Sequence, residues 1–443
     1  MPRAKAPKQP STICRFFSKP GGCRNGDNCR FRHTHENRPS SPEDLTKATN
    51  NQNPPPDCAV THDDTITYTK DTQYYCLDDI GVFLVDNVLF RVHATQVFGP
   101  RPASIPEPME GISPIHIEDI LLKLPSSSDS NPIVLTGVTV KQFRNYLLAI
   151  TCRPDDAQYP TLATGYNEHW GCDKLQDVYT LYLNIATLAR LFGVPKLEGW
   201  AMDVLYSIFA NPHHPLTKFA LVNWSVGSLI HLRNLSRNTK LDQPAMRFIQ
   251  YLVSVNLNDT DMDYSSANVR ACVDLYDIIK NSDDDPILLG CVFLNLLSLG
   301  HRSLIWSERV SRKDRAILYA AQVRFADAIG EFQNLEWLTL GPPHIELAGC
   351  PALCRNCQIK LNDIWRGCFG TLGRGLGSGQ LLKDVSLLSQ LAKKRWEFYQ
   401  NWKDTARCCW HSLPNRLTDI LEANIQALYE KVASRYRELA EEV

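Results

Sequence analysis

The sequence predicts an α+β fold, because a short group of strands precedes a long run of helices and the two do not alternate. Two apolar runs, residues 82–85 and 88–92, are separated only by Asp86 and Asn87. Both of these residues tolerate positive φ, so the pattern predicts a β-hairpin with a two-residue turn. Residues 132–135, which Gly137 follows, predict a third strand.

Helical spacing takes over after the third strand. Apolar residues recur every three or four positions from Phe143 to Ile150, and residues 178–192 and 197–209 continue in the same manner. From about Pro215 the pattern is almost wholly helical. Residues 315–332 predict one long amphipathic helix, and a continuous apolar stripe from Leu417 to Leu439 predicts another. The apolar run 287–299 is too short to cross a bilayer and predicts a buried helix.

Changes in composition divide the 443 residues into segments. Residues 37–70 are rich in Asn, Pro, Asp and Thr, which predicts a disordered linker. The expected organisation is a basic tail over residues 1–10, a zinc finger over 11–36, the linker over 37–70, an α+β domain over 71–212 and a helical region over 213–443.

Charge is unevenly placed along the chain. The formal net charge is −1, which excludes a polyanion-binding surface spread over the whole molecule. From Met1 to His33, however, the sequence has several Lys and Arg residues and only one acidic residue, Asp27. A local excess of this kind attracts phosphate groups. The N-terminus has no secretory signal, so we expect a soluble intracellular protein of the nucleus or the cytoplasm, without a membrane partner. In a reducing compartment, the 15 cysteines are better metal ligands or buried apolar residues than disulfides.

Four residues near the N-terminus have the spacing of a metal site. They follow the pattern Cys14-x8-Cys23-x5-Cys29-x3-His33. Three thiolates and one imidazole predict a closed tetrahedral zinc site of the structural kind. A segment this short cannot bury enough apolar surface to fold alone, so the metal must supply the folding free energy, about 10–16 kcal/mol in zinc-finger peptides.

Aromatic and basic side chains lie between these ligands and have little core to enter. Exposed rings can stack on unpaired bases while guanidinium groups contact phosphates. The predicted contacts to single-stranded RNA are Phe16, Phe31, Arg15, Arg24, Arg30 and Arg32. A ring that covers the metal is the alternative, which we expect for Phe17.

The segment resembles the CCCH (C3H1) family of zinc fingers through "ICRFF" and "GGCRNGDNCRFRH". The resemblance implies that Phe31, two residues after the third cysteine, stacks on a base. The family often has a second aromatic two residues after the second cysteine, where this chain has Asn25. Because the chain has a single finger and lacks this second aromatic residue, we expect weak, salt-sensitive RNA binding.

The domain behind the linker resembles the BTB/POZ domain, in particular divergent fungal members. The resemblance rests on residues 78–98, 131–150 and 181–209, which match its hairpin, its third strand with the next helix, and its closing helical pair. It implies a non-catalytic module that binds proteins, with homodimerisation left open. Where the family carries a helix with paired aromatics, this chain has four prolines between Pro100 and Pro108.

The C-terminal part of the chain contains a second group of possible zinc ligands. The C-terminal cysteines Cys350, Cys354, Cys357 and Cys408 are a weaker candidate for a second site, because their spacing is irregular and cysteine is often simply buried. The glycine run from Gly373 to Gly379 matches no phosphate-binding motif. No catalytic motif predicts an enzyme.

The sequence therefore predicts an RNA-binding adaptor whose finger contacts single-stranded RNA and whose BTB-like body contacts proteins. The alternative is a protein-interaction module, such as a ubiquitin-ligase adaptor, whose finger contacts protein.

Overall fold

The computed structural model describes residues 68–75, 81–93, 97–98, 120, 123–164, 172–210, 222–258, 267–325, 331–332, 335–339, 355–375, 381–405 and 413–443. The chain divides into two units, Met1–Ile66 and Thr67–Val443, and all described residues lie in the second. The predicted finger and residues 37–67 of the predicted linker therefore lie outside the described residues.

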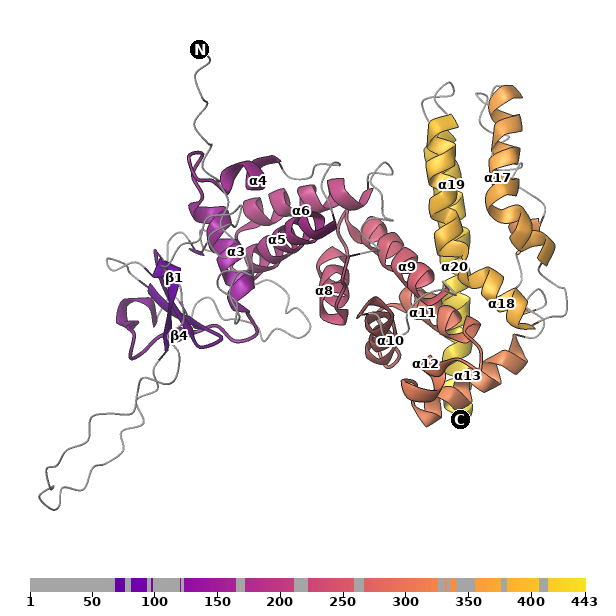
Figure 1. Ribbon diagram of the computed structural model, residues 1–443, viewed down its shortest axis with the longest axis horizontal. Coiled ribbons are helices and arrows are strands. Elements are labelled where there is room, and N and C mark those ends of the chain that lie inside the picture. The colour runs from indigo at the N-terminus through magenta and orange to yellow at the C-terminus, as the bar shows by residue number, and fades with distance from the viewer. Residues whose placement is uncertain are drawn as a thin grey trace, which may run out of the picture. The chain divides into compact units, whose positions relative to one another are not determined.

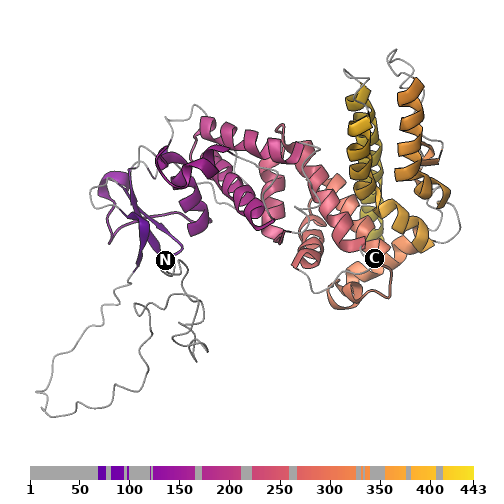
Figure 2. The same cartoon turned by 45° about the horizontal axis from the view of Figure 1, so that its top comes forward.

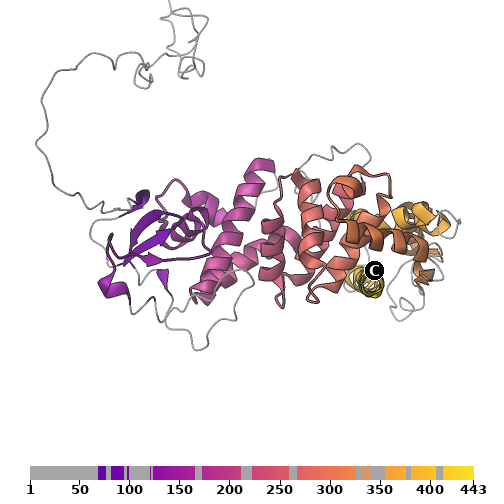
Figure 3. The same ribbon diagram turned by 90° about the horizontal axis from the view of Figure 1, so that it is seen from below.

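The described part begins with a four-stranded sheet (Figure 1). Its order is β1-β3-β2-β4, with β2 and β3 antiparallel and the two outer pairs parallel. The strands are β1 (Thr69–Tyr75), β2 (Gly81–Val85), β3 (Val88–Val92) and β4 (Ile133–Val134). Figure 3 gives a second view of the sheet, in indigo.

The predicted hairpin is confirmed. Asp86 and Asn87 join β2 to β3 with φ values of 44° and 63°, as a two-residue turn of type I′ requires. The Asp86 carboxylate also accepts a hydrogen bond from the backbone N–H of Val140, over 3.2 Å. Val140 is the first residue of helix α3 (Val140–Thr151), whose N-cap Thr139 forms a capping box with Gln142. The hairpin turn thus holds the start of α3.

One face of the sheet packs against α3 and the end of helix α5 (Cys172–Leu191) through an aromatic core. The Phe90 and Phe143 rings meet edge to face with centroids 4.9 Å apart, and Tyr146 and Phe192 do so at 5.1 Å. All four side chains are fully buried. Edge-to-face packing adds to the stabilisation from apolar burial, so this cluster fixes α3 and α5 on the sheet.

The other regular elements in the described ranges are helices, together with the 3-10 turn η4 (Leu124–Ser126). The helices after α3 are α4 (Tyr159–Thr164), α5, α6 (Pro195–Ala210), α8 (Val226–Ser236), α9 (Asp242–Asn258), α10 (Ala267–Ile279), α11 (Pro286–Ser298), α12 (Leu304–Glu308), α13 (Arg312–Arg324), α15 (Glu336–Thr339), α17 (Arg355–Gly375), α18 (Leu381–Ser389), α19 (Leu391–Thr405) and α20 (Leu413–Glu442). The expected α+β class with a mainly helical C-terminal region agrees with these elements.

Helix α11 is the buried helix that the apolar run predicts, because ten consecutive residues from Leu288 to Leu297 are buried. It packs against α9, α10, α18 and α20. The C-terminal helix α20 carries the expected apolar stripe, and most of its members are buried against neighbouring helices. Figure 2 shows α17 beside the pair formed by α19 and α20. None of the helices in the described ranges is both long and apolar enough to span a bilayer.

Three details differ from the sequence-based expectations. Strand β1 begins at Thr69, so the predicted linker, drawn to residue 70, extends too far. Helix α13 ends at Arg324, although the apolar spacing continues to Phe332. Buried residues of α5 and α6 share one apolar core with α8 and α9, so the boundary drawn at 212/213 does not separate two cores.

Candidate functional site

The predicted zinc ligands, Cys14, Cys23, Cys29 and His33, lie outside the described residues, as do the predicted RNA contacts of the finger. The chemistry of the donor set still tests which metal fits. Three soft thiolates and one imidazole suit zinc and leave no ligand position for substrate or water. The site is therefore suited to holding a fold together and not to activating water.

Most of the second candidate zinc site also lies outside the described residues. This holds for Cys350, Cys354 and Cys408 and for the side chain of Cys357, although its backbone begins α17. Where the structure does describe side chains, no three His, Cys, Asp or Glu residues are grouped so that they could hold a metal.

The described thiols are Cys152, Cys272, Cys291 and Cys368, and none forms a disulfide. Cys272, Cys291 and Cys368 are buried. Burial raises the pKa of Cys291 to about 12 and also raises the pKa of Cys272 and of Cys368. A buried neutral thiol is a poor nucleophile and a poor metal ligand, so these three cysteines act as core residues.

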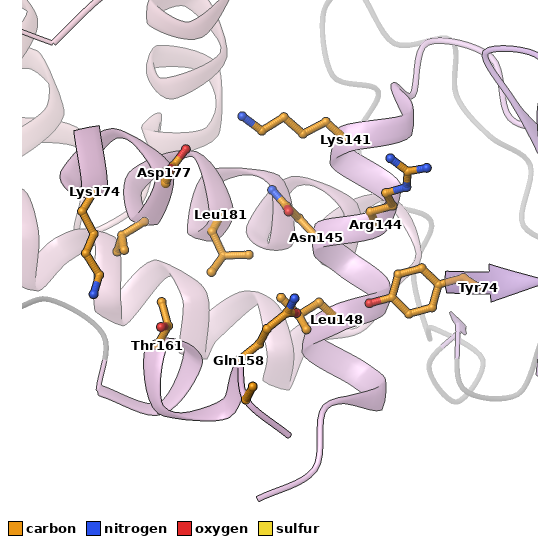
Figure 4. A pocket seen from close by; sticks show the side chains of 12 residues that line it. Tyr74, Lys141, Arg144, Asn145, Leu148, Gln158, Thr161, Lys174, Asp177 and Leu181 are labelled. Atoms are coloured by element: carbon orange, nitrogen blue, oxygen red, sulfur yellow. The ribbon is translucent and has the colours of Figure 1, made fainter. Parts of the chain in front are cut away.

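A cleft of about 470 Å³ lies between α3, α4 and α5, beside Tyr74 of β1 (Figure 4). Lys141, Arg144 and Asn145 come from α3, and Lys174 and Asp177 come from α5. Gln158 and Thr161 line the cleft from the segment that contains α4 (Figure 4). Side chains from three helices thus converge on one opening.

Burial separates an apolar floor from a polar rim in this cleft. Val178 and Leu181 are buried, whereas Lys141, Lys174 and Asp177 are exposed. Apolar side chains can bind the face of a flat or aliphatic ligand, and the polar rim can fix its orientation. This combination is typical of sites for small polar molecules.

Arg144 is held in place at the cleft by Asp71. Its Nε donates to the Asp71 carboxylate over 2.7 Å, and the backbone N–H of Tyr74 donates to the other carboxylate oxygen over 2.8 Å. The Asp71 side chain is fully buried, while Arg144 stays 44 % exposed. The pair fixes the arginine stem and leaves part of its guanidinium in contact with solvent.

A second, smaller cavity of about 230 Å³ lies where α9, α19 and α20 meet. Beneath it, Arg395 donates to Glu422 and to the Gln250 side chain over 3.0 Å each, and the Tyr399 hydroxyl donates to Glu422 over 3.2 Å. These groups are buried. Because Arg395 and Tyr399 both pair with Glu422 across these helices, we assign this network to packing of the three helices.

The residues of this cleft are not among the site residues that the sequence predicts. Lys141, Arg144 and Asn145 share one helical face by their spacing, and this signal was available. Lys174 lies about 30 residues further along the chain, and only the packing of α5 against α3 brings it to the same opening.

Comparison with known proteins identifies the N-terminal segment. Residues 12–33 match the family model of the CCCH-type zinc finger, and this range includes all four predicted ligands. No curated protein and no solved structure matches the chain. The match supports a CCCH-type zinc finger in this segment, and fingers of that family bind zinc.

Proposed function

We propose that the chain is a zinc-dependent adaptor that binds single-stranded RNA through its finger and proteins through its body. The match of residues 12–33 to the CCCH-type zinc finger is the observation that carries this proposal, since fingers of that family commonly bind RNA. The basic N-terminal segment supports it, because polyanion binding needs a local excess of positive charge.

In this proposal zinc is bound by Cys14, Cys23, Cys29 and His33 and supplies the free energy that folds the finger. Phe31 and Phe16 stack on unpaired bases. The arginines contact phosphates and 2′-hydroxyl groups, and they are Arg15, Arg24, Arg30 and Arg32. One finger offers few contacts, so the affinity is modest and falls steeply with salt.

The body is proposed as a non-catalytic, BTB-like module that makes protein contacts. A hairpin, a short third strand, the helix α3 and the helical pair α5–α6 follow one another in the order that the resemblance implies. This order supports the proposal. We further propose that the chain acts inside the cell, in the nucleus or the cytoplasm, and leave its homodimerisation to measurement.

Titration of the full chain with labelled single-stranded RNA at several salt concentrations tests the RNA-binding proposal. Phe31→Ala should weaken binding by about tenfold, because base–aromatic stacking contributes about 1–3 kcal/mol per base. Asn25→Ala is the matched control on the same finger and should leave binding almost unchanged. Absence of binding by the zinc-loaded chain at low salt would exclude the proposal.

The competing proposal is a protein-interaction module or ubiquitin-ligase adaptor whose finger contacts protein and not RNA. The implied BTB-like order of elements favours it as the second candidate. Cross-linking of the wild-type chain and of Phe31→Ala in cells distinguishes the two. Loss of RNA adducts with retained protein adducts supports the first proposal, and the reverse supports the second.

A further inference from the structure

The cleft between α3, α4 and α5 carries an inference beyond the finger. We propose that it binds a ribonucleotide, either free or as one unit of single-stranded RNA. The site lies wholly in the body and does not depend on RNA binding by the finger. Its lining supplies a suitable group for each part of a nucleotide, as the following steps show.

The phosphate would be bound by the cationic rim. Lys141 and Lys174 line the cleft from two helices, together with one carboxylate, Asp177, while the Arg144 guanidinium turns away from the centre of the cleft (Figure 4). Asp71 neutralises part of the Arg144 charge from behind. Lys141 makes no ion pair with any other residue in the described ranges and is exposed. The Lys141 ammonium therefore remains available at the rim, which suits a phosphate monoester or diester.

The base would be bound by the floor and by two primary amides. Leu148, Val178 and Leu181 provide an apolar surface for a base face. Asn145 and Gln158 reach the cleft from different walls, and neither side chain hydrogen-bonds to another described residue. A primary amide both donates and accepts, so it can pair with the edge of a base in two hydrogen bonds.

The sugar would be bound by Asp177 and Thr161. A carboxylate accepts hydrogen bonds from ribose hydroxyls, which is how dinucleotide-binding sites hold a 2′-hydroxyl. Asp177 is exposed at the rim and forms no ion pair with the rest of the described chain. A carboxylate is otherwise unfavourable in an anion site, so its presence selects a ligand with hydroxyl groups as well as phosphate.

The size of the cleft agrees with a nucleotide. Its volume of about 470 Å³ lies within the range of small-molecule sites, about 300–1,000 Å³. A free phosphate would fill only part of this space and would leave the apolar floor uncovered. The carboxylates of an acidic peptide would satisfy the cations but would be repelled by Asp177.

Calorimetric titration of the full zinc-loaded chain with AMP, CMP, GMP and UMP tests the proposal. At least one ribonucleotide should bind. Lys141→Glu and Asn145→Ala should each weaken that binding at least about tenfold, since a bidentate base contact contributes about 1–3 kcal/mol. Lys141 lies in the first turn of α3, where an acidic side chain suits the helix dipole, so the variant should fold. Gln158→Ala, at an exposed position, provides a further variant.

The matched control is Lys393→Glu, which makes the same charge change in the first turn of α19, away from the cleft, and should bind like wild type. Asp177→Asn should reduce the preference for AMP over dAMP. The proposal is overturned if no ribonucleotide binds at millimolar concentration, if the cleft variants bind like Lys393→Glu, or if inorganic phosphate or an acidic peptide binds as tightly as the best nucleotide.

Competition separates the two sources of the nucleotide. In a Cys29→Ala chain, which lacks the finger's zinc site, a single-stranded oligoribonucleotide either displaces the bound mononucleotide or does not. Displacement by the oligonucleotide identifies the cleft as a second RNA contact. Retention of the mononucleotide identifies a site for free nucleotide. If the cleft binds nucleotide in a chain whose finger binds no RNA, this inference stands and the proposed function fails.

Discussion

Gly290 of α11 lies directly against the backbone carbonyl of Tyr429 in α20. A β-carbon at position 290 would overlap that carbonyl oxygen, whereas the glycine allows the two helices to approach closely. Both helices are buried along this contact, and α20 carries much of the apolar stripe that closes the helical core. A single hydrogen atom in place of a side chain thus sets the spacing of two central helices.

Gly290→Ala should destabilise the protein, although alanine is the better helix former. The new methyl group must push α11 away from α20, and overpacking of this kind costs about 1–3 kcal/mol. The free energy of unfolding, measured in urea with circular dichroism, checks this. Gly199→Ala in α6 is the matched control, because nothing lies within 4 Å of its β-carbon position. That variant should gain about 0.5–1 kcal/mol, and equal effects at both positions would refute the argument.

Some parts of this fold can be predicted from the sequence because local chemistry specifies them. Asp86 and Asn87 accept positive φ, so the hairpin follows from two residues. The apolar run of α11 likewise identifies a buried helix, since few of its positions are polar. In both cases the signal lies within about a dozen consecutive residues.

Other parts depend on long-range contacts. Strand β1 is polar, and its place in the sheet depends on pairing with β3 and on the ion pair between Asp71 and Arg144. The spacing of Phe325 and Phe332 fits one continuous helix, in which they would lie about 10 Å apart along the axis. Their ring centroids are instead 4.9 Å apart, so the chain turns after α13. The cleft could not be predicted for the same reason, since its walls meet only in the folded chain.

Stability should fall in mild acid because of His231. Burial lowers the pKa of its imidazole to about 4, and its Nε2 shares a hydrogen bond of 2.6 Å with Thr187. The unfolded chain, with an ordinary histidine pKa near 6.5, binds a proton that the folded chain excludes. The contribution of the neutral His231 to the free energy of unfolding is complete above pH 6.5. It is lost as the pH falls toward 4, by about 2 kcal/mol at pH 5.

Urea unfolding of the wild type and of His231→Gln at pH 7.5 and pH 5 measures this effect. The variant should be less stable at pH 7.5 but should lose about 2 kcal/mol less than the wild type between the two pH values. His301, which is exposed, gives the matched control, because His301→Gln should keep the full pH dependence. A His231→Gln chain with an unchanged pH dependence would show that other groups cause it.

The buried pair of Arg395 and Glu422 should show strong coupling in a double-mutant cycle. Removal of one partner leaves the other charge buried without compensation, which costs about 3–5 kcal/mol. Arg395→Met and Glu422→Leu should therefore each destabilise strongly, while the double variant should cost clearly less than the sum. The exposed pair of Lys240 and Asp203 serves as control, with an expected coupling below about 1 kcal/mol. Additive effects at Arg395 and Glu422 would contradict this assignment.

Zinc removal should unfold the finger and leave the body intact. The two lie in separate units of the chain, and the described body has its own apolar cores. Cys29→Ala should therefore lower the zinc content by one ion per chain, abolish RNA binding by the finger and leave the cooperative melting of the body unchanged. Cys368→Ala is the control, because that thiol is buried and neutral in α17 and should not change the zinc content. Metal analysis of the wild type also decides the second candidate site, since a single zinc ion per chain would assign Cys350, Cys354, Cys357 and Cys408 no metal, and two ions would assign them one. A melting transition of the body that shifts on Cys29→Ala would show instead that the finger and the body are energetically coupled.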